Sequence, residues 1–350
     1  MAIDTTDLFR RMPKAELHLH LDGSLRPSTA LDLARQRGLD DGMDLAAITA
    51  RLQAPPQAAN QAELLRAFDL PIALMQDEEA LYRIAFELVE DVARDGTRYV
   101  EVRWGPLLHV QLGLELSAGI AAVVAGTRDA ALATGVVARL IAVAIRSHPP
   151  EANAVMARVS ADFRDRGLTG FDLAGPEEAF PDARAHARAF DIAREAGLGI
   201  TIHAGEWGGA DQVRKSLEAV SPSRIAHGAR AADDASLMAD LAARGVTLDV
   251  CPTSNVQASI FPSLAAFPLP QLLAAGVPVT LSTDDRTVSD LTLVREYERT
   301  HSVVGISIAD LWRMNLHALE VAFVDDEPVR AQLIAEFQAF ATAEPLLRID

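Results

Sequence analysis

The sequence predicts an α/β protein, a (β/α)8 TIM barrel with a helical insertion after the first strand, as a single domain over residues 1–350. Short apolar runs alternate with longer stretches rich in Ala, Leu, Arg and Glu, which indicates parallel strands joined by helices. Candidate chemical residues follow the first, fifth, sixth, seventh and eighth runs. A closed barrel brings all of these positions to one mouth, whereas an open doubly wound sheet, the alternative, would spread them along an edge.

The eight predicted strands are short, and glycines or polar residues follow most of them. They lie around residues 16–21, 98–104, 137–145, 169–174, 199–203, 224–228, 247–251 and 278–283. The first connection is the longest, roughly residues 24–96, with a loop at 55–60 and a predicted helix at 63–68. This insertion either covers the mouth as a lid or is ordinary core.

Composition limits the classes of function. The chain has 350 residues, 49% of them hydrophobic and 23% charged, which is typical of a globular protein. Its net charge of −17, with no basic stripe, argues against a nucleic-acid partner. The single cysteine, Cys251, cannot form an intramolecular disulfide, and we find neither a signal peptide nor an apolar run of membrane-spanning length. We therefore expect a cytoplasmic protein without a membrane partner; the oligomeric state stays open.

The first strand carries two histidines one residue apart. Strand side chains alternate between faces, so His18 and His20 point the same way, and Asp22 and Gly23 follow them. Two imidazoles on one face at a strand end suit a metal ion. The alternative is a pair of hydrogen-bonded core histidines.

Two later strands also end in histidines. His203 ends the fifth, and Glu206 follows it in the loop, within reach of the same substrate. His227 ends the sixth and precedes a turn glycine, so a structural role is its alternative. The seventh strand ends at Cys251, whose apolar surroundings and lack of basic neighbours favour a structural residue over a nucleophile.

The eighth strand ends in two adjacent carboxylates, Asp284 and Asp285. They are candidates for a functional site, and the alternative is that they cap the next helix. In a barrel this strand closes onto the first, so Asp284 would lie beside the two histidines of that strand. Three imidazoles and one carboxylate suit Zn²⁺. Four protein ligands alone could make a closed structural site. The surplus polar groups at the mouth, Glu206, His227 and Asp285, favour an open catalytic site.

Five segments, 13–23, 203–206, 225–228, 251–255 and 282–285, resemble the motifs of the adenosine deaminase family of metal-dependent hydrolases, in the family order. The resemblance runs from about residue 11 to the C-terminal helices. It implies zinc-dependent deamination of adenosine and 2′-deoxyadenosine, with release of ammonia. The small-molecule partner would be a purine nucleoside.

The resemblance also implies residue roles. One zinc ion per chain would be bound by His18, His20, His203 and Asp284. Glu206 would donate a proton to the purine, His227 would orient the attacking water, and Asp285 would bind the imidazole part of the purine. The remaining substrate contacts would come from His20, from Asp22 to the ribose hydroxyls, and from the backbone of Gly175 to the pyrimidine edge. Arg286 departs from the family pattern, in which proline is common.

Several alternatives stay open or are disfavoured. Adenine deaminases resemble this chain but tend to carry Glu in place of Asp22. 6-Aminodeoxyfutalosine carries a distal carboxylate that Arg286 could bind. AMP is disfavoured because no basic cluster or glycine-rich loop for a phosphate is evident. Neither lysine, Lys14 nor Lys215, lies on the fourth strand, which disfavours a two-metal hydrolase, and one cysteine excludes a zinc cytidine deaminase. A zinc-binding protein without turnover is the non-enzymatic alternative.

Overall fold

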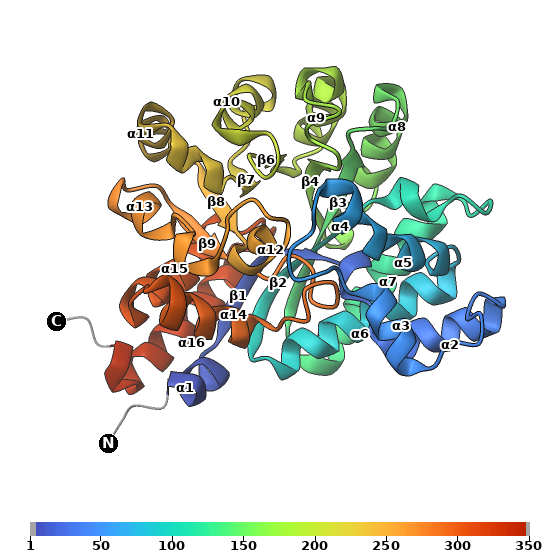
Figure 1. The fold of residues 1–350 in the computed structure, drawn as a ribbon, viewed down its shortest axis with the longest axis horizontal. Helices are drawn as coiled ribbons and strands as arrows, with labels where there is room; N and C mark the ends of the chain where they lie inside the picture. The colour runs from blue at the N-terminus through green and yellow to red at the C-terminus, as the bar shows by residue number, and fades with distance from the viewer. Residues whose placement is uncertain (1–4, 348–350) are drawn as a thin grey trace.

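The computed structural model describes residues 5–347, whose strands form a barrel surrounded by helices (Figure 1). Two parallel sheets, in the orders β1-β2-β3-β4-β5 and β6-β7-β8-β9, build its wall. The strands are β1 (Lys14–His20), β2 (Thr97–Trp104), β3 (Val137–Ile145), β4 (Leu168–Ala174), β5 (Gly199–Ile200), β6 (His203–Ala204), β7 (Arg224–His227), β8 (Thr247–Val250) and β9 (Val279–Leu281).

Backbone hydrogen bonds close both seams between the sheets. The fifth predicted strand is split into β5 and β6, and the link between them stays paired: Thr201 N donates to Phe171 O at 3.1 Å, and Ala226 N to Ile202 O at 2.9 Å. At the other seam Asp284 N donates to His18 O at 3.0 Å, and His20 N to Asp284 O at 2.7 Å. The eight predicted strands and the predicted barrel are therefore confirmed, with one strand interrupted.

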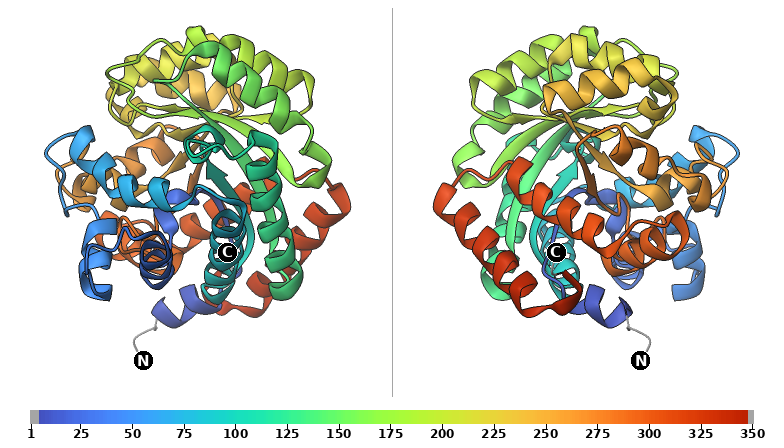
Figure 2. Two further views of the ribbon diagram at one scale, coloured as in Figure 1. Left: turned by 90° about the vertical axis from the view of Figure 1, so that its right-hand side faces the viewer. Right: turned by 90° about the vertical axis from the view of Figure 1, so that its left-hand side faces the viewer.

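Amphipathic helices cover the outside of the barrel (Figure 2). In α6, buried Leu81, Ile84, Leu88 and Val92 recur every three or four residues, and Asp77 caps the first turn by accepting from Ala80 N at 2.8 Å. The helices outside the insertion are α1 (Thr5–Arg11), α6 (Glu78–Arg94), α7 (Leu116–Thr134), α8 (Pro150–Ala161), α9 (Ala187–Glu195), α10 (Gly209–Val220), α11 (Ala235–Arg244), α12 (Pro252–Gln257), α13 (Leu269–Ala274), α14 (Leu293–Arg299), α15 (Ile308–Val321) and α16 (Glu327–Ala343).

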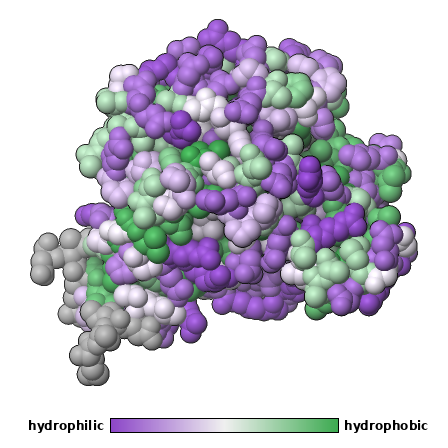
Figure 3. Space-filling view, in the orientation of Figure 1, coloured by the Kyte–Doolittle hydropathy of each residue, from purple (hydrophilic) through white to green (hydrophobic). Residues whose placement is uncertain are grey.

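Helix α7 is long and apolar enough to cross a membrane, by length and composition alone. In the fold it packs against α6 and β3 as one of the outer helices. The face shown in Figure 3 is mainly hydrophilic, with smaller apolar areas between the polar residues.

The predicted insertion contains α2 (Pro27–Arg37), α3 (Leu45–Leu52), α4 (Gln61–Leu65) and α5 (Asp69–Leu74). The helix expected at 63–68 begins earlier, because Asn60 caps α4 by accepting from Glu63 N at 3.0 Å, and it ends in a 3-10 turn. A small apolar cluster joins the insertion to loops that follow β6, β8 and β9. Its members are Ala54, Ala58, Leu64, Ala67, Ala258 and Val288, with Trp207 packed against them. The insertion thus lies over the loops at the carboxyl ends of the strands.

The barrel interior holds fully buried ion pairs. Arg103 on β2 donates to Asp172 on β4 at 2.9 Å, and Arg224 on β7 is bonded to Glu101 on β2. Arg224 Nε also lies 3.3 Å from Asp249 on β8. Because β2 is not adjacent to β4 or β7 in the sheet, these contacts cross the interior. Each buried charge has a partner of opposite sign, which offsets its desolvation.

Candidate active site

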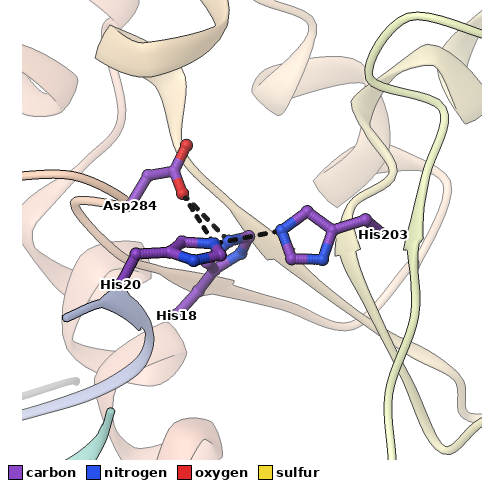
Figure 4. Close-up of side chains that lie close together, drawn as sticks. All are labelled: His18, His20, His203 and Asp284. Atoms are coloured by element: carbon purple, nitrogen blue, oxygen red, sulfur yellow. Dashed lines mark hydrogen bonds and ion pairs between the residues drawn. The ribbon is translucent and has the colours of Figure 1, made fainter. Parts of the chain in front are cut away.

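Four side chains from three strand ends converge at the mouth (Figure 4). His18 and His20 lie on β1, His203 on β6, and Asp284 in the segment that follows β9. His20 Nε2 lies 3.2 Å from His203 Nε2 and 3.4 Å from Asp284 Oδ1, and His18 Nε2 lies 3.1 Å from the same oxygen. Ligands about 2.0–2.1 Å from a tetrahedral zinc ion are separated by about 3.3 Å. The four side chains therefore fit one Zn²⁺.

The protonation of the histidines also fits a metal. Burial lowers the pKa of His20 to about 4 and places the pKa of His18 well below its ordinary value. Both rings are thus neutral at pH 7, and a metal needs a neutral imidazole as its ligand. Neither ring nitrogen of His18 makes a hydrogen bond within the described residues, so Nε2, which faces Asp284, is available to an ion.

Backbone strain accompanies two of the site residues. His227 has a φ of 63° and Asp284 a φ of 67°, in the left-handed region that residues other than glycine seldom occupy. Such strain persists where the surrounding structure over-determines the conformation, and it clusters at functional sites. At Asp284, backbone hydrogen bonds to both His18 and His20 hold the residue in place.

Asp172 orients His203, and the sequence did not reveal this role. Its Oδ2 lies 2.9 Å from His203 Nδ1 and accepts from Arg103 Nη1 at 2.9 Å, while its Oδ1 accepts from Leu173 N at 2.7 Å. With Nδ1 fixed, His203 presents Nε2 to the cluster. Ser254 acts similarly, since its hydroxyl donates to Asp284 Oδ2 at 2.6 Å and leaves Oδ1 facing the histidines.

Replacing Asp172 with Asn should weaken metal binding about 10–100-fold, because outer-shell partners fix the orientation and basicity of ligands. Competition against a chromophoric zinc chelator would measure the affinity. Asp249→Asn is the matched control, since Asp249 is an equally buried aspartate that contacts Arg103 and Arg224 but no histidine of the cluster. An equal loss of affinity in both variants would mean that Asp172 acts only on the fold.

Glu206 follows β6 and lies beside the cluster, with its Oε2 3.7 Å from His227 Nε2. Burial raises the pKa of Glu206 to about 8, and the nearby Asp284 carboxylate adds to the effect. Glu177, which the sequence also did not single out, holds this loop. Its carboxylate accepts from Gly205 N at 2.8 Å and from the amides of Trp207 and Gly208 at 3.0 Å each.

His227 is held by Asn255, from the segment after β8. Asn255 Nδ2 lies 3.1 Å from His227 Nδ1, and His227 Nε2 lies 3.9 Å from Asp284 Oδ2. An amide NH₂ can only donate, so the neutral ring carries its proton on Nε2, which faces the carboxylates. Cys251 lies near His18 and His227, but burial places the pKa of its thiol well above its ordinary value. This fits the structural role expected for Cys251.

The remaining predicted substrate contacts also border the mouth. Asp285 is buried, and its Oδ1 has no hydrogen-bond partner among residues 5–347. It packs so closely on Gly23 that a Cβ there would lie 1.7 Å from Oδ1. Gly23 is therefore required beside Asp285. Asp22 Oδ1 lies 3.8 Å from His20 Nδ1. Gly175 follows β4 with a φ of 104°, a conformation that favours glycine.

Arg286 is engaged within the protein. Its Nη2 donates to Glu16 on β1 at 2.9 Å and to Asp95, the residue that follows α6, at 3.1 Å. The side chain is buried, and its charge is balanced by these two carboxylates. The geometry thus favours a structural arginine over one that binds the carboxylate of a substrate.

A parallel barrel with three histidines and one aspartate at the carboxyl ends of its strands defines a metal-dependent hydrolase. The adenosine deaminase family model matches residues 13–339. An adenine deaminase from Rhizobium meliloti is 40% identical over 93% of this chain and 98% of the relative. An adenosine deaminase from Mycobacterium avium is 35% identical over 90% of this chain and 91% of the relative.

A solved amidohydrolase from Burkholderia ambifaria with bound Zn is 28% identical, has a TM-score of 0.86, and covers 98% of this chain and 96% of its own. The chain belongs to the adenosine deaminase family. It is thus an enzyme of a zinc-dependent family of purine deaminases, hydrolases that act on C–N bonds.

Proposed function

We propose that this enzyme deaminates adenosine and 2′-deoxyadenosine to inosine and 2′-deoxyinosine. The observation that carries the proposal is the Asp22 carboxylate, which is 5% exposed beside His20 and whose Oδ1 lacks a hydrogen-bond partner in the part of the chain that the structure describes. A buried acceptor without a donor costs about 1–3 kcal/mol, and a ribose hydroxyl would supply the donor.

Zn²⁺ held by the four ligands would supply an activated water by lowering its pKa to roughly 7. The protein's own residues would do the rest. Attack at C6 of the purine places negative charge on N1, and Glu206, kept neutral by burial, would donate a proton there. His227 would orient the water on one face of the ring. Loss of ammonia from the tetrahedral carbon leaves a 6-oxopurine.

Asp285 would bind the imidazole part of the purine. In a nucleoside this part offers N7, which can only accept a hydrogen bond, so a carboxyl must be protonated to pair with it. Burial, followed by the charge of Asp284, places the pKa of Asp285 well above its ordinary value. The protonation state that this contact needs is therefore the one that the surroundings favour.

Adenine is the second candidate substrate, because a relative as similar as 40% identical is named an adenine deaminase. Asp22 separates the two candidates. A site built to bind a hydroxyl rejects an analogue that lacks it, since the carboxylate is then left unpaired. 6-Aminodeoxyfutalosine is the less favoured substrate, because Arg286, the candidate partner of its carboxylate, pairs with Glu16 and Asp95 instead.

A substrate panel tests the proposal. We expect kcat/KM to be higher for adenosine and 2′-deoxyadenosine than for adenine, and Asp22→Ala to narrow this difference by at least about tenfold. Ammonia release measures each rate, and 6-aminodeoxyfutalosine completes the panel. Preference for adenine by the unmodified enzyme would overturn the proposal, and Arg286→Ala should affect adenosine and 6-aminodeoxyfutalosine equally.

The pH profile should have an alkaline limb that belongs to Glu206. A proton donor is active only below its pKa, and burial raises that pKa to about 8. A bound cation acts in the opposite direction, so we expect kcat/KM to fall as the pH rises through 8 or somewhat below it. The residual activity of Glu206→Gln should lack this limb. An unchanged limb in that variant would assign it to another group.

A further inference from the structure

His109 is a buried histidine whose ring makes no hydrogen bond to any residue that the structure describes. It ends the 3-10 turn Pro106–His109, which follows β2, and it is 1% exposed. Both Nδ1 and Nε2 lack a hydrogen-bond partner within the described residues. Leaving a buried polar ring unpaired costs free energy, so such a group in a native structure calls for a partner that the protein itself does not supply.

The ring lies beside Asp22 but makes no direct hydrogen bond to it. His109 Nε2 lies 3.8 Å from Asp22 Oδ2, too far for a direct hydrogen bond. An oxygen to one side of the line that joins these two atoms can lie about 2.8 Å from each of them and bridge them. A hydroxyl can do this, because its O–H donates a hydrogen bond to the carboxylate while its oxygen accepts a hydrogen bond from the imidazole N–H.

The turn that carries His109 is held by the insertion. Gln76, which is buried between α5 and α6, donates from Nε2 to Leu108 O at 2.8 Å and accepts from Gln111 N at 2.9 Å. The two bonded residues flank His109 on either side. The imidazole therefore sits on a fixed turn, and its distance from Asp22 is set by the fold.

We infer that His109 and Asp22 form a two-point site for one hydroxyl of the substrate sugar. This inference rests on the proposed function, which it deepens by assigning the nucleoside preference to a second residue. His109 lies outside the five motif segments, and it would act in substrate specificity without touching the reacting atoms.

Matched substrates and variants test the inference. His109→Leu removes the hydrogen bond and keeps an apolar side chain, and His109→Gln restores a donor. His186→Leu is the control, because His186 is a buried histidine bonded to Asn153 and Arg146 O, away from Asp22. Rates are measured with adenosine, its 2′-, 3′- and 5′-deoxy analogues, and adenine, together with thermal unfolding of each variant.

We expect His109→Leu to lower kcat/KM for adenosine at least about tenfold, mainly through KM, and His109→Gln to recover part of the loss. One deoxy analogue should be turned over equally by the unmodified enzyme and His109→Leu, and that analogue identifies the bound hydroxyl. His186→Leu should change unfolding without changing the ratios between substrates.

An equal loss of kcat/KM in His109→Leu for every substrate, or no loss for any of them, would overturn the inference. A structural histidine, or one that binds only water, does not distinguish between substrates that differ in one hydroxyl. A failure of the proposed function is visible separately. The unmodified enzyme would then turn over adenine and not adenosine. That result would contradict the proposed sugar-hydroxyl site as well.

Discussion

Replacing Glu206 with Gln is expected to lower kcat at least about a hundredfold, because general acid catalysis typically contributes 10²–10⁴-fold. Gln has nearly the shape of a protonated glutamic acid, but it cannot give up a proton to N1 of the ring. The loop should keep its position, since the amides of Gly205, Trp207 and Gly208 are held by Glu177 and not by Glu206. Single-turnover measurements of adenosine deamination would report the chemical step.

Zinc content and far-UV circular dichroism should be unchanged in Glu206→Gln, because Glu206 is outside the ligand set. Glu178→Gln is a suitable control, since it removes one carboxylate from an exposed position next to Glu177. It should retain full activity. Near-normal turnover in zinc-loaded Glu206→Gln would remove Glu206 from the mechanism and leave the source of the N1 proton to another group.

The sequence predicted what depends on local pattern and on strand order. Alternation of apolar runs located all eight strands, and the closure of the eighth onto the first correctly placed Asp284 beside His18 and His20. Because side chains alternate between the two faces of a strand, the two histidines of β1 were expected on one face. These inferences succeed because strand geometry and barrel topology are nearly invariant once the elements are known.

The residues that the sequence did not reveal act through contacts between distant segments. Asp172 meets His203 from the neighbouring strand position, Glu177 reaches the loop of Glu206, and His109 faces Asp22 from the turn after β2. Each is a single ordinary residue with no spacing signal of its own. Arg286 illustrates the same limit, because its partners Glu16 and Asp95 became neighbours only through folding.

Removing the metal is expected to abolish turnover and to lower the midpoint of thermal unfolding. The four ligand atoms come from three segments far apart in the sequence, so an ion that binds them ties β1, β6 and the segment after β9 together. An ion that binds only the folded state stabilises it by about 2.7 kcal/mol at a free concentration one hundred times its Kd. Zinc analysis of the purified protein should give about one ion per chain.

The variant His203→Ala removes the metal by mutation instead of by chelation. It removes one ligand and leaves the Asp172 carboxylate without its imidazole, so we expect loss of zinc and of nearly all activity, which added zinc should not restore. In His186→Ala, the histidine control, zinc content should stay at one ion per chain even if unfolding occurs at a lower temperature, because the His186 ring bonds to Asn153 and to the backbone oxygen of Arg146 and not to the cluster. Full activity after exhaustive chelation, or a reproducible content of two ions per chain, would contradict a single-metal site, because the four converging ligand atoms lie within 4.8 Å of one another and define one position.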